Sequence, residues 1–138
     1  MKIVLDTNVL VSGLLTPFGP NGEIVRMVVA GKLDLCLDAR ILSEYDEVLY
    51  RPKFKFKKEH ITMLLDFIKQ TGQYVSSVPL KKPLPDPDDE PFLEVAIAAN
   101  VKSLISGNRL HYPSPSRQGI SIHSRSEFLE FYRKQCDT

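Results

Sequence analysis

The sequence has no tryptophan, only two cysteines and no long hydrophobic run, and its net charge is close to zero. Cys36 and Cys136 form neither a disulfide framework nor the ligand spacing of a zinc site, and Cys36 is expected to be a buried free thiol. The longest apolar stretches, such as residues 9–15, fall far short of the ~20 residues that span a bilayer, so we expect no membrane association. A formal net charge of +1 at pH 7 leaves nucleic-acid binding to local patches.

The remaining composition is that of a folded protein. With 138 residues, 43% of them hydrophobic and 25% charged, the chain suits one globular domain over residues 1–138 and is not disordered. Asp6 interrupts the one apolar segment near the start, so a signal peptide is not expected. We therefore expect a cytoplasmic protein.

Short apolar runs alternate with helical patterns along the chain. Strands are predicted at residues 2–5, 33–37, 74–78, 103–106 and 120–122. Helices are predicted around residues 24–29, 41–49, 59–71, 92–99 and 127–132, the last capped by Ser124 or Ser126. This alternation predicts an α/β fold with a central, mostly parallel sheet. In such folds ligands bind beyond the carboxyl ends of the strands.

Asp6 comes directly after the first apolar run and is followed by Thr7 and Asn8. A carboxylate at the end of a buried strand is costly unless it is paired, bound to a metal or open to a cleft. One interpretation is a helix cap or turn residue. The other is a metal ligand or nucleophile, which the three consecutive polar residues favour.

A second group of acids lies in residues 86–94, with five carboxylates and no basic residue: Asp86, Asp88, Asp89, Glu90 and Glu94. Asp88 or Asp89 suits a helix N-cap, and acids in a first turn complement the helix dipole. Those needs account for one or two acids rather than five. Clustered carboxylates repel unless a cation neutralises them, and hard oxygen ligands suit Mg²⁺ or Mn²⁺.

Two further charged features admit two interpretations each. Glu44 and Asp46 flank the apolar stripe of one predicted helix at equal offsets, and both suit a solvated face. Residues 51–58 alternate basic and aromatic side chains and include Lys55 and Lys57. That segment is able to follow a phosphate backbone and stack a base, or it is a surface loop whose aromatic rings pack inward.

Four pieces of the sequence, in this order, resemble the PIN domain nucleases: IVLDTNVL at 3–10, SEYDEVL and RPKF within 43–54, DPDD and FLEVA within 86–96, and ISGNRLHYP at 105–113. The resemblance covers nearly the whole chain. It implies a three-layer α/β/α sandwich with a twisted sheet and an Mg²⁺- or Mn²⁺-dependent ribonuclease that cleaves single-stranded RNA. It also implies the toxin of a prokaryotic toxin–antitoxin pair, with an antitoxin protein as partner, and we expect a homodimer.

Carried over by position, the resemblance makes Asp6, Glu44 and Asp89 the catalytic and metal-binding acids, with Asp88 as the alternative to Asp89. It thereby chooses Glu44 over Asp46. Two other functions stay open at this point. One is an RNA-binding module with weak or absent catalysis, and the other is an RNA-processing nuclease without a toxin role.

The resemblance also assigns supporting roles. Thr7, Asn8 and Asn108 would hold the ligands or metal-bound waters, and Arg109 or His111 would contact the phosphate. Asn108 departs from the family pattern, because many PIN domains have a fourth aspartate there. An amide adds no charge, so a second metal would be held less strongly.

Overall fold

A parallel sheet forms the centre of the fold in the computed structural model, which describes residues 1–136. Its strands are β1 (Lys2–Leu5), β2 (Asp34–Leu37), β3 (Gln73–Tyr74), β4 (Ser103–Ile105) and β5 (Ile122–His123). Their order across the sheet is β3-β2-β1-β4-β5, and every pairing is parallel. The predicted α/β class is confirmed, with a sheet that is parallel throughout.

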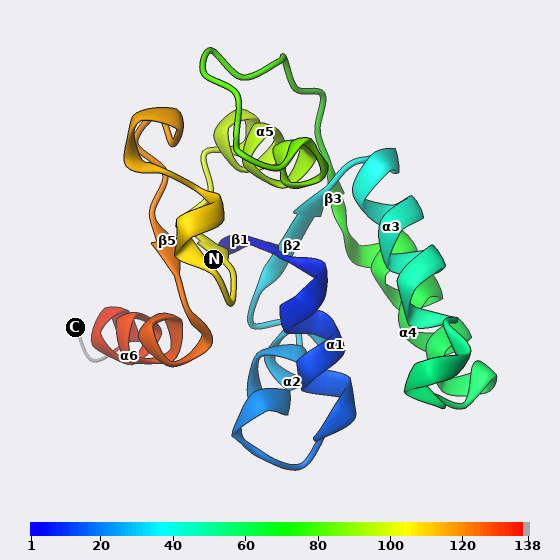
Figure 1. Ribbon diagram of the computed structural model, residues 1–138. Coiled ribbons are helices and arrows are strands. Elements are labelled where there is room, and N and C mark those ends of the chain that lie inside the picture. Colours follow the sequence, from blue (N-terminus) through cyan, green and yellow to red (C-terminus); the bar gives the residue numbers. More distant parts are fainter. Residues whose placement is uncertain (137–138) are drawn as a thin grey trace.

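Six α-helices lie within residues 1–136: α1 (Thr7–Leu15), α2 (Glu23–Val29), α3 (Ala39–Leu49), α4 (Lys58–Thr71), α5 (Glu90–Ala99) and α6 (Arg125–Cys136). Figure 1 shows α5 on one side of the sheet and α6 on the other. Helix α5 packs against β1, β2 and β4, whereas α6 packs against β4 and β5. Helices on both faces of one sheet make the three-layer sandwich that the resemblance implies. No helix among residues 1–136 is long and apolar enough to cross a membrane.

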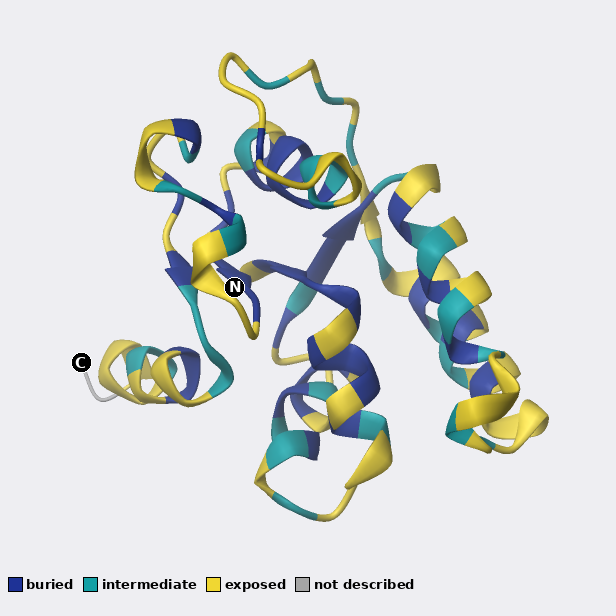
Figure 2. Ribbon diagram, viewed as in Figure 1, coloured by how far each residue is buried: buried dark blue, intermediate teal, exposed yellow. Residues whose placement is uncertain are grey.

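The central strands are buried on both faces. Ile3, Val4 and Leu5 of β1 are at most 1% exposed, β4 is buried throughout, and Figure 2 shows the middle of the sheet as buried. A strand that helices cover on both sides has no solvent-facing side, so its sequence is a continuous apolar run without alternation. Cys36 of β2 is buried and free, as predicted.

Helix α1 is absent from the elements predicted from sequence. It is buried around most of its circumference, at Thr7, Val9, Leu10, Val11 and Gly13, so its apolar residues form no single stripe. A Cβ at Gly13 would lie 2.7 Å from Val25 Cγ2 and 2.9 Å from Asn21 O. The glycine therefore permits the close approach of α1 to the segment that leads into α2.

Several boundaries differ from those predicted. Strand β3 ends at Tyr74 rather than 78, and β5 occupies Ile122–His123 rather than 120–122. Helix α6 starts earlier than expected, at Arg125. Ser124 caps it, because Ser124 Oγ accepts a hydrogen bond from Glu127 N at 3.2 Å and Glu127 Oε1 accepts one from Ser124 N at 2.9 Å. This reciprocal capping box decides between the two predicted caps.

The sheet topology brings two chain segments together at the carboxyl ends of β1 and β4. From β1 the chain proceeds to β2 and β3 on one side, then returns to β4 on the other. Leu5 lies opposite Ile105 in the register, so Asp6 and Ser106 follow neighbouring strand ends. In parallel sheets the crevice at such a reversal of strand order is the usual ligand site.

Candidate active site

Asp6 is held by hydrogen bonds from three donors. It is 7% exposed and caps α1, with Oδ1 accepting from Asn8 N at 3.3 Å. Its Oδ2 accepts from the hydroxyl groups of Ser106 and Tyr112, both at 3.0 Å. A helix cap needs only the first of these contacts. The two hydroxyl donors stabilise an ionised carboxylate in a buried position and fix the direction in which it points.

Sequence reasoning assigned no role to Ser106 or Tyr112. Ser106 offers the same signal as Asp6, a polar residue directly after a buried strand. Tyr112 lies beyond the short 3-10 helix η4 (Arg109–His111), and no local pattern points to it. It is fully buried, and burial together with the charge of Asp6 raises the pKa of Tyr112 above its ordinary value. The Tyr112 hydroxyl therefore stays protonated and acts as a donor to Asp6.

Helix α3 brings Glu44 to the same edge of the sheet. Tyr45, fully buried, donates a hydrogen bond from its hydroxyl to Leu5 O at 2.5 Å and so fixes α3 against the end of β1. Glu44, the preceding residue, accepts a hydrogen bond from the Thr7 hydroxyl. Asp46, by contrast, is exposed and lies beside Lys69 of α4. The structure thus places Glu44 rather than Asp46 beside Asp6.

Burial also changes the ionisation of Glu44. Desolvation raises the pKa of Glu44, the hydrogen bond from Thr7 offsets part of that rise, and the charges of Asp6 and Asp88 add to it. Asp6 and Asp88, which come from separate parts of the chain, therefore each lie near enough to Glu44 for their charges to disfavour its ionised form.

Three of the five acids in residues 86–94 have structural partners. Asp86 accepts a hydrogen bond at 2.9 Å from the backbone N–H two residues on and so caps the 3-10 helix η3 (Pro87–Asp89). Glu90 accepts one at 3.0 Å from the backbone of Leu84. Glu94 is buried and pairs with Arg40 at 2.7 Å. Asp89 occupies the N-cap position of α5, one of the two predicted positions, but its side chain makes no capping hydrogen bond, whereas Asp86 caps η3.

Asp89 differs from Asp88 in its surroundings. Asp88 is exposed, whereas the Asp89 side chain is 15% exposed and its Oδ2 is buried without a hydrogen bond from any residue in 1–136. His111 Nδ1 lies 3.0 Å from this oxygen, an ion pair only when the imidazole is protonated. Burial, followed by the charge of Asp6, raises the pKa of Asp89 to about 6, and His111 opposes the rise. Asp89 is therefore the partly buried acid of the pair and is close enough to Asp6 for that charge to raise its pKa.

The donor chemistry at this edge fits a hard divalent cation. Asp6, Glu44 and Asp89 offer carboxylate oxygens, the ligands that Mg²⁺ and Mn²⁺ prefer, and Asp89 Oδ2 is a buried oxygen with no hydrogen bond. Within residues 1–136, no three acidic, histidine or cysteine side chains stand close enough together to enclose an ion as they are. Asp6, Glu44 and Asp89 are the residues whose oxygens would be offered to a metal at this edge.

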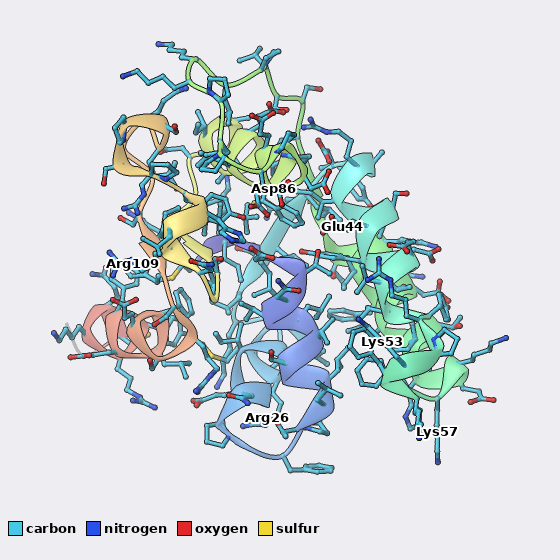
Figure 3. The ribbon with its side chains drawn as sticks, viewed as in Figure 1. Arg26, Glu44, Lys53, Lys57, Asp86 and Arg109 are labelled. Atoms are coloured by element: carbon cyan, nitrogen blue, oxygen red, sulfur yellow. The ribbon has the colours of Figure 1, made fainter. Side chains whose placement is uncertain are left out.

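The residues assigned supporting roles occupy different places. Thr7 contacts Glu44, whereas Asn8 is exposed and contributes its backbone N–H to Asp6. Asn108 Oδ1 caps η4 by accepting a hydrogen bond from Leu110 N at 3.1 Å. Arg109 pairs with Glu127 of α6 at 2.9 Å, and Figure 3 shows it well to the left of Glu44. Of the two expected phosphate contacts, only His111 lies beside an acid of the site.

The basic segment, residues 51–58, lies apart from the acids. Lys55 and Lys57 are exposed, next to the 3-10 helix η2 (Pro52–Phe54) and at the start of α4. Phe54 and Phe56 are half-buried and stack on each other, with ring centroids 5.6 Å apart. In Figure 3, Lys53 and Lys57 lie toward the lower right, away from Glu44 and Asp86. The structure thus agrees with the second interpretation of this segment, a surface loop whose aromatic rings pack inward.

Comparison with known proteins adds a family match. A family model described as a PIN domain matches residues 2–110. The matched segment includes Asp6, Glu44, Asp89 and Ser106, and it ends before Tyr112 and α6. Among curated proteins, none matches the sequence.

Proposed function

Because the chain belongs to the PIN domain family, which indicates a nuclease-type function, we propose that it is a metal-dependent endoribonuclease that cleaves single-stranded RNA. The observation that supports this best is the convergence of three acids at one strand edge. The charge of Asp6 raises the pKa values of both Glu44 and Asp89, although the three residues come from distant segments. The fold holds these carboxylates together despite their mutual repulsion. A bound cation would relieve that repulsion, so the arrangement is suited to bind one.

Mg²⁺ or Mn²⁺ bound by these acids would lower the pKa of a bound water and stabilise negative charge on the phosphodiester. The chain's own residues prepare that chemistry. Ser106 and Tyr112 orient Asp6, and Thr7 orients Glu44. Asp89, with a pKa of about 6, is an ionised ligand at neutral pH. His111, next to Asp89, is placed to contact the substrate phosphate when protonated.

Two acids on one helix provide a matched test of this proposal. We expect Glu44→Gln to reduce cleavage of labelled single-stranded RNA in Mn²⁺ by more than about a hundredfold. Mutation of a residue that only hydrogen-bonds a metal ligand typically lowers activity about 10–100-fold, and loss of the ligand itself should cost more. Asp46→Asn removes the same charge from the exposed side of α3 and should retain wild-type activity. Cleavage that persists in EDTA, or equal effects of the two substitutions, would contradict the proposal.

A second candidate function is an RNA-binding module that does not cleave. Asn108 favours it, because this side chain caps η4 at the position where the resemblance expects a fourth carboxylate. The same assay separates the two functions, since binding without Mn²⁺-dependent product would support the module. An RNA-processing nuclease without toxicity would instead cleave RNA in the assay.

We also propose that the protein is the toxin of a toxin–antitoxin pair, acts as a homodimer and binds an antitoxin protein, in line with the resemblance. Brief induction in cells should then arrest growth for the wild type and not for Glu44→Gln. Sequencing of the RNA ends produced during the arrest would identify the target. Growth that continues while RNA is cut would favour the processing role.

A further inference from the structure

A hollow with several hydrogen-bonding side chains lies at the carboxyl edge of the sheet, on a different face of α1 from Glu44. On α1, Asn8 and Ser12 are four residues apart and share one face, about 100–140° round the helix from Thr7, which contacts Glu44. The hollow has a volume of about 180 Å³ and is lined by Asn8, Val9, Ser12, Asn21, Gly107 and Arg125. The nuclease proposal assigns no role to it.

Arg125 differs from the other arginines of the chain. The six others each bond a carboxylate or a backbone carbonyl: Arg26, Arg40, Arg51, Arg109, Arg117 and Arg133. Arg125, the first residue of α6, is half-buried and makes no hydrogen bond or ion pair with any residue in 1–136. A guanidinium group that lines a hollow and has no counter-ion within the protein is available to an external anion.

The rest of the lining suits the same kind of ligand. Asn8, Ser12 and Asn21 carry amide and hydroxyl groups that can donate hydrogen bonds, and no carboxylate from residues 1–136 lines the hollow. A cation with several neutral donors is the usual protein complement of a phosphate group, which an arginine binds through two of its N–H groups.

The hollow adjoins the acids through the backbone on both sides. Asn8 donates its backbone N–H to Asp6 Oδ1 at 3.3 Å. Gly107 directly follows Ser106, whose hydroxyl donates to Asp6 Oδ2 at 3.0 Å. A phosphate in the hollow would therefore lie close to Asp6, on a different face of α1 from Thr7 and Glu44.

We propose that this hollow binds a backbone phosphate of the RNA strand next to the linkage that is cleaved, with Arg125 as its cation and Asn8, Ser12 and Asn21 as neutral donors. The proposal builds on the proposed nuclease function, because it gives the strand a path from the hollow across the acids. Arg125 is then a substrate-binding residue that positions the strand and does not touch the reacting atoms.

Binding without cleavage tests the site directly. In EDTA, we expect Arg125→Ala to weaken the affinity for single-stranded RNA about tenfold and to reduce the slope of log affinity against log salt by about 0.7, the value for one phosphate contact. Arg125→Lys should keep the slope and lose part of the affinity. Arg133→Ala is the matched control, because it removes the same charge from the exposed far end of α6. Thermal melting of each variant confirms that it is folded.

Cleavage in Mn²⁺ separates this proposal from the nuclease proposal. For an oligonucleotide, Arg125→Ala should raise KM with little change in kcat, whereas hydrolysis of bis(p-nitrophenyl) phosphate, which has no neighbouring phosphate, should be unchanged. If the wild type hydrolyses neither substrate and Arg125→Ala still weakens RNA binding, the nuclease proposal fails and the phosphate site stands.

Two results would overturn the site. One is an RNA affinity of Arg125→Ala equal to that of Arg133→Ala. The other is stabilisation of the wild type, but not of Arg125→Ala, by inorganic phosphate while RNA affinity is the same in both. That second outcome would assign the hollow to free phosphate instead of a polynucleotide.

Discussion

Residues 86–94 and residues 51–58 are two dense runs of like charge, one acidic and one basic, and the fold gives them different surroundings. In the acidic run, one side chain caps a helix, one bonds a backbone N–H, one pairs with Arg40, and Asp89 lies partly buried near Asp6. In the basic run, the lysines are exposed and the two phenylalanine rings stack on each other. Only the acidic segment lies near a charge from a distant part of the chain, Asp6, at the carboxyl end of the sheet.

The difference lies in solvation. Exposed lysines keep their water, so their mutual repulsion is screened and costs little free energy of folding. Asp89 loses water and lies near Asp6, so its ionised form is disfavoured and its pKa rises to about 6. A cluster of charged residues is therefore suited to form a binding site only when the fold buries some of its side chains and brings them close to charges from other segments. The following predictions test that distinction.

The largest effect is expected from Asp6→Asn. The asparagine keeps the size of the side chain and an oxygen for hydrogen bonding but removes the negative charge that follows β1. We expect RNA cleavage in Mn²⁺ to fall by more than about a hundredfold. Asp66→Asn, an exposed carboxylate on α4, should leave the rate unchanged. Comparable losses in both variants would show that the position of the charge is irrelevant.

The pH dependence of the free energy of unfolding should reveal the raised pKa of Asp89. With a pKa of about 6 in the folded protein and 3.8 as its ordinary value, Asp89 binds more protons when folded than when unfolded between those pH values. Its contribution therefore makes the metal-free protein less stable as pH rises through that window, by about 3 kcal/mol at pH 7.5 at most. Asp89→Asn should reduce this decline and leave the smaller contribution of Glu44, whose pKa is also raised, as measured by urea unfolding in EDTA at pH 4 and pH 7.5.

Asp88→Asn is the control for that experiment, because Asp88 is the exposed neighbour in the same run. It should keep the wild-type difference in stability between the two pH values. A decline that is unchanged in Asp89→Asn and reduced in Asp88→Asn would reverse the assignment of the two acids.

The sequence predicted those features of the fold and of the candidate site that depend on local pattern. Asp6 follows an unbroken apolar run, and that run is continuous because β1 is covered by helices on both faces. Ser124 was one of two predicted caps, and its reciprocal hydrogen bonds with Glu127 form a capping box. The α/β class followed from the alternation of strand and helix patterns. Each of these signals lies within a few residues of the feature it predicts.

Contacts between distant residues were beyond the sequence pattern. Glu44 and Asp46 are equivalent on a helical projection, and the hydrogen bond from Thr7, 37 residues away, shows that Glu44 is the one that lies beside the Asp6 segment. Tyr112 reaches Asp6 across a separation of 106 residues. Helix α1 escaped prediction because burial on most sides removes the apolar stripe by which helices are recognised. In each case tertiary packing decides between locally equal alternatives.

Tyr112→Phe tests whether a buried hydroxyl supports the acidic edge. The substitution keeps the ring in the core and removes one of the donors to Asp6 Oδ2. Since hydrogen bonds to charged groups are stronger than neutral ones, we expect a loss of about 2 kcal/mol in the free energy of unfolding at pH 7.5. Tyr74→Phe, at the half-exposed edge strand β3, should change stability by less than about 0.5 kcal/mol. Equal values for the two variants would show that the hydroxyl does not stabilise Asp6.

The smallest effect is expected from the basic segment. Replacing Lys55, Lys57 and Lys58 with alanine should weaken single-stranded RNA binding less than tenfold, because these side chains are exposed and distant from the acids. If all three contact phosphates, the slope of log affinity against log salt should fall by about two, since each contact with a single strand contributes about 0.7. Fluorescence anisotropy in EDTA over a range of salt concentrations measures both quantities.

A matched triple variant, with alanine at the exposed Lys32, Lys102 and Lys134, removes the same charge elsewhere on the surface. It lowers the general attraction to RNA equally, so only a contact with phosphate makes the two variants differ in slope. Identical slopes would mean that residues 51–58 are a solvated surface and that the RNA path does not cross them. If the slope falls only in the Lys55, Lys57 and Lys58 variant, the bound RNA strand would instead extend from the acids along α3 to the start of α4.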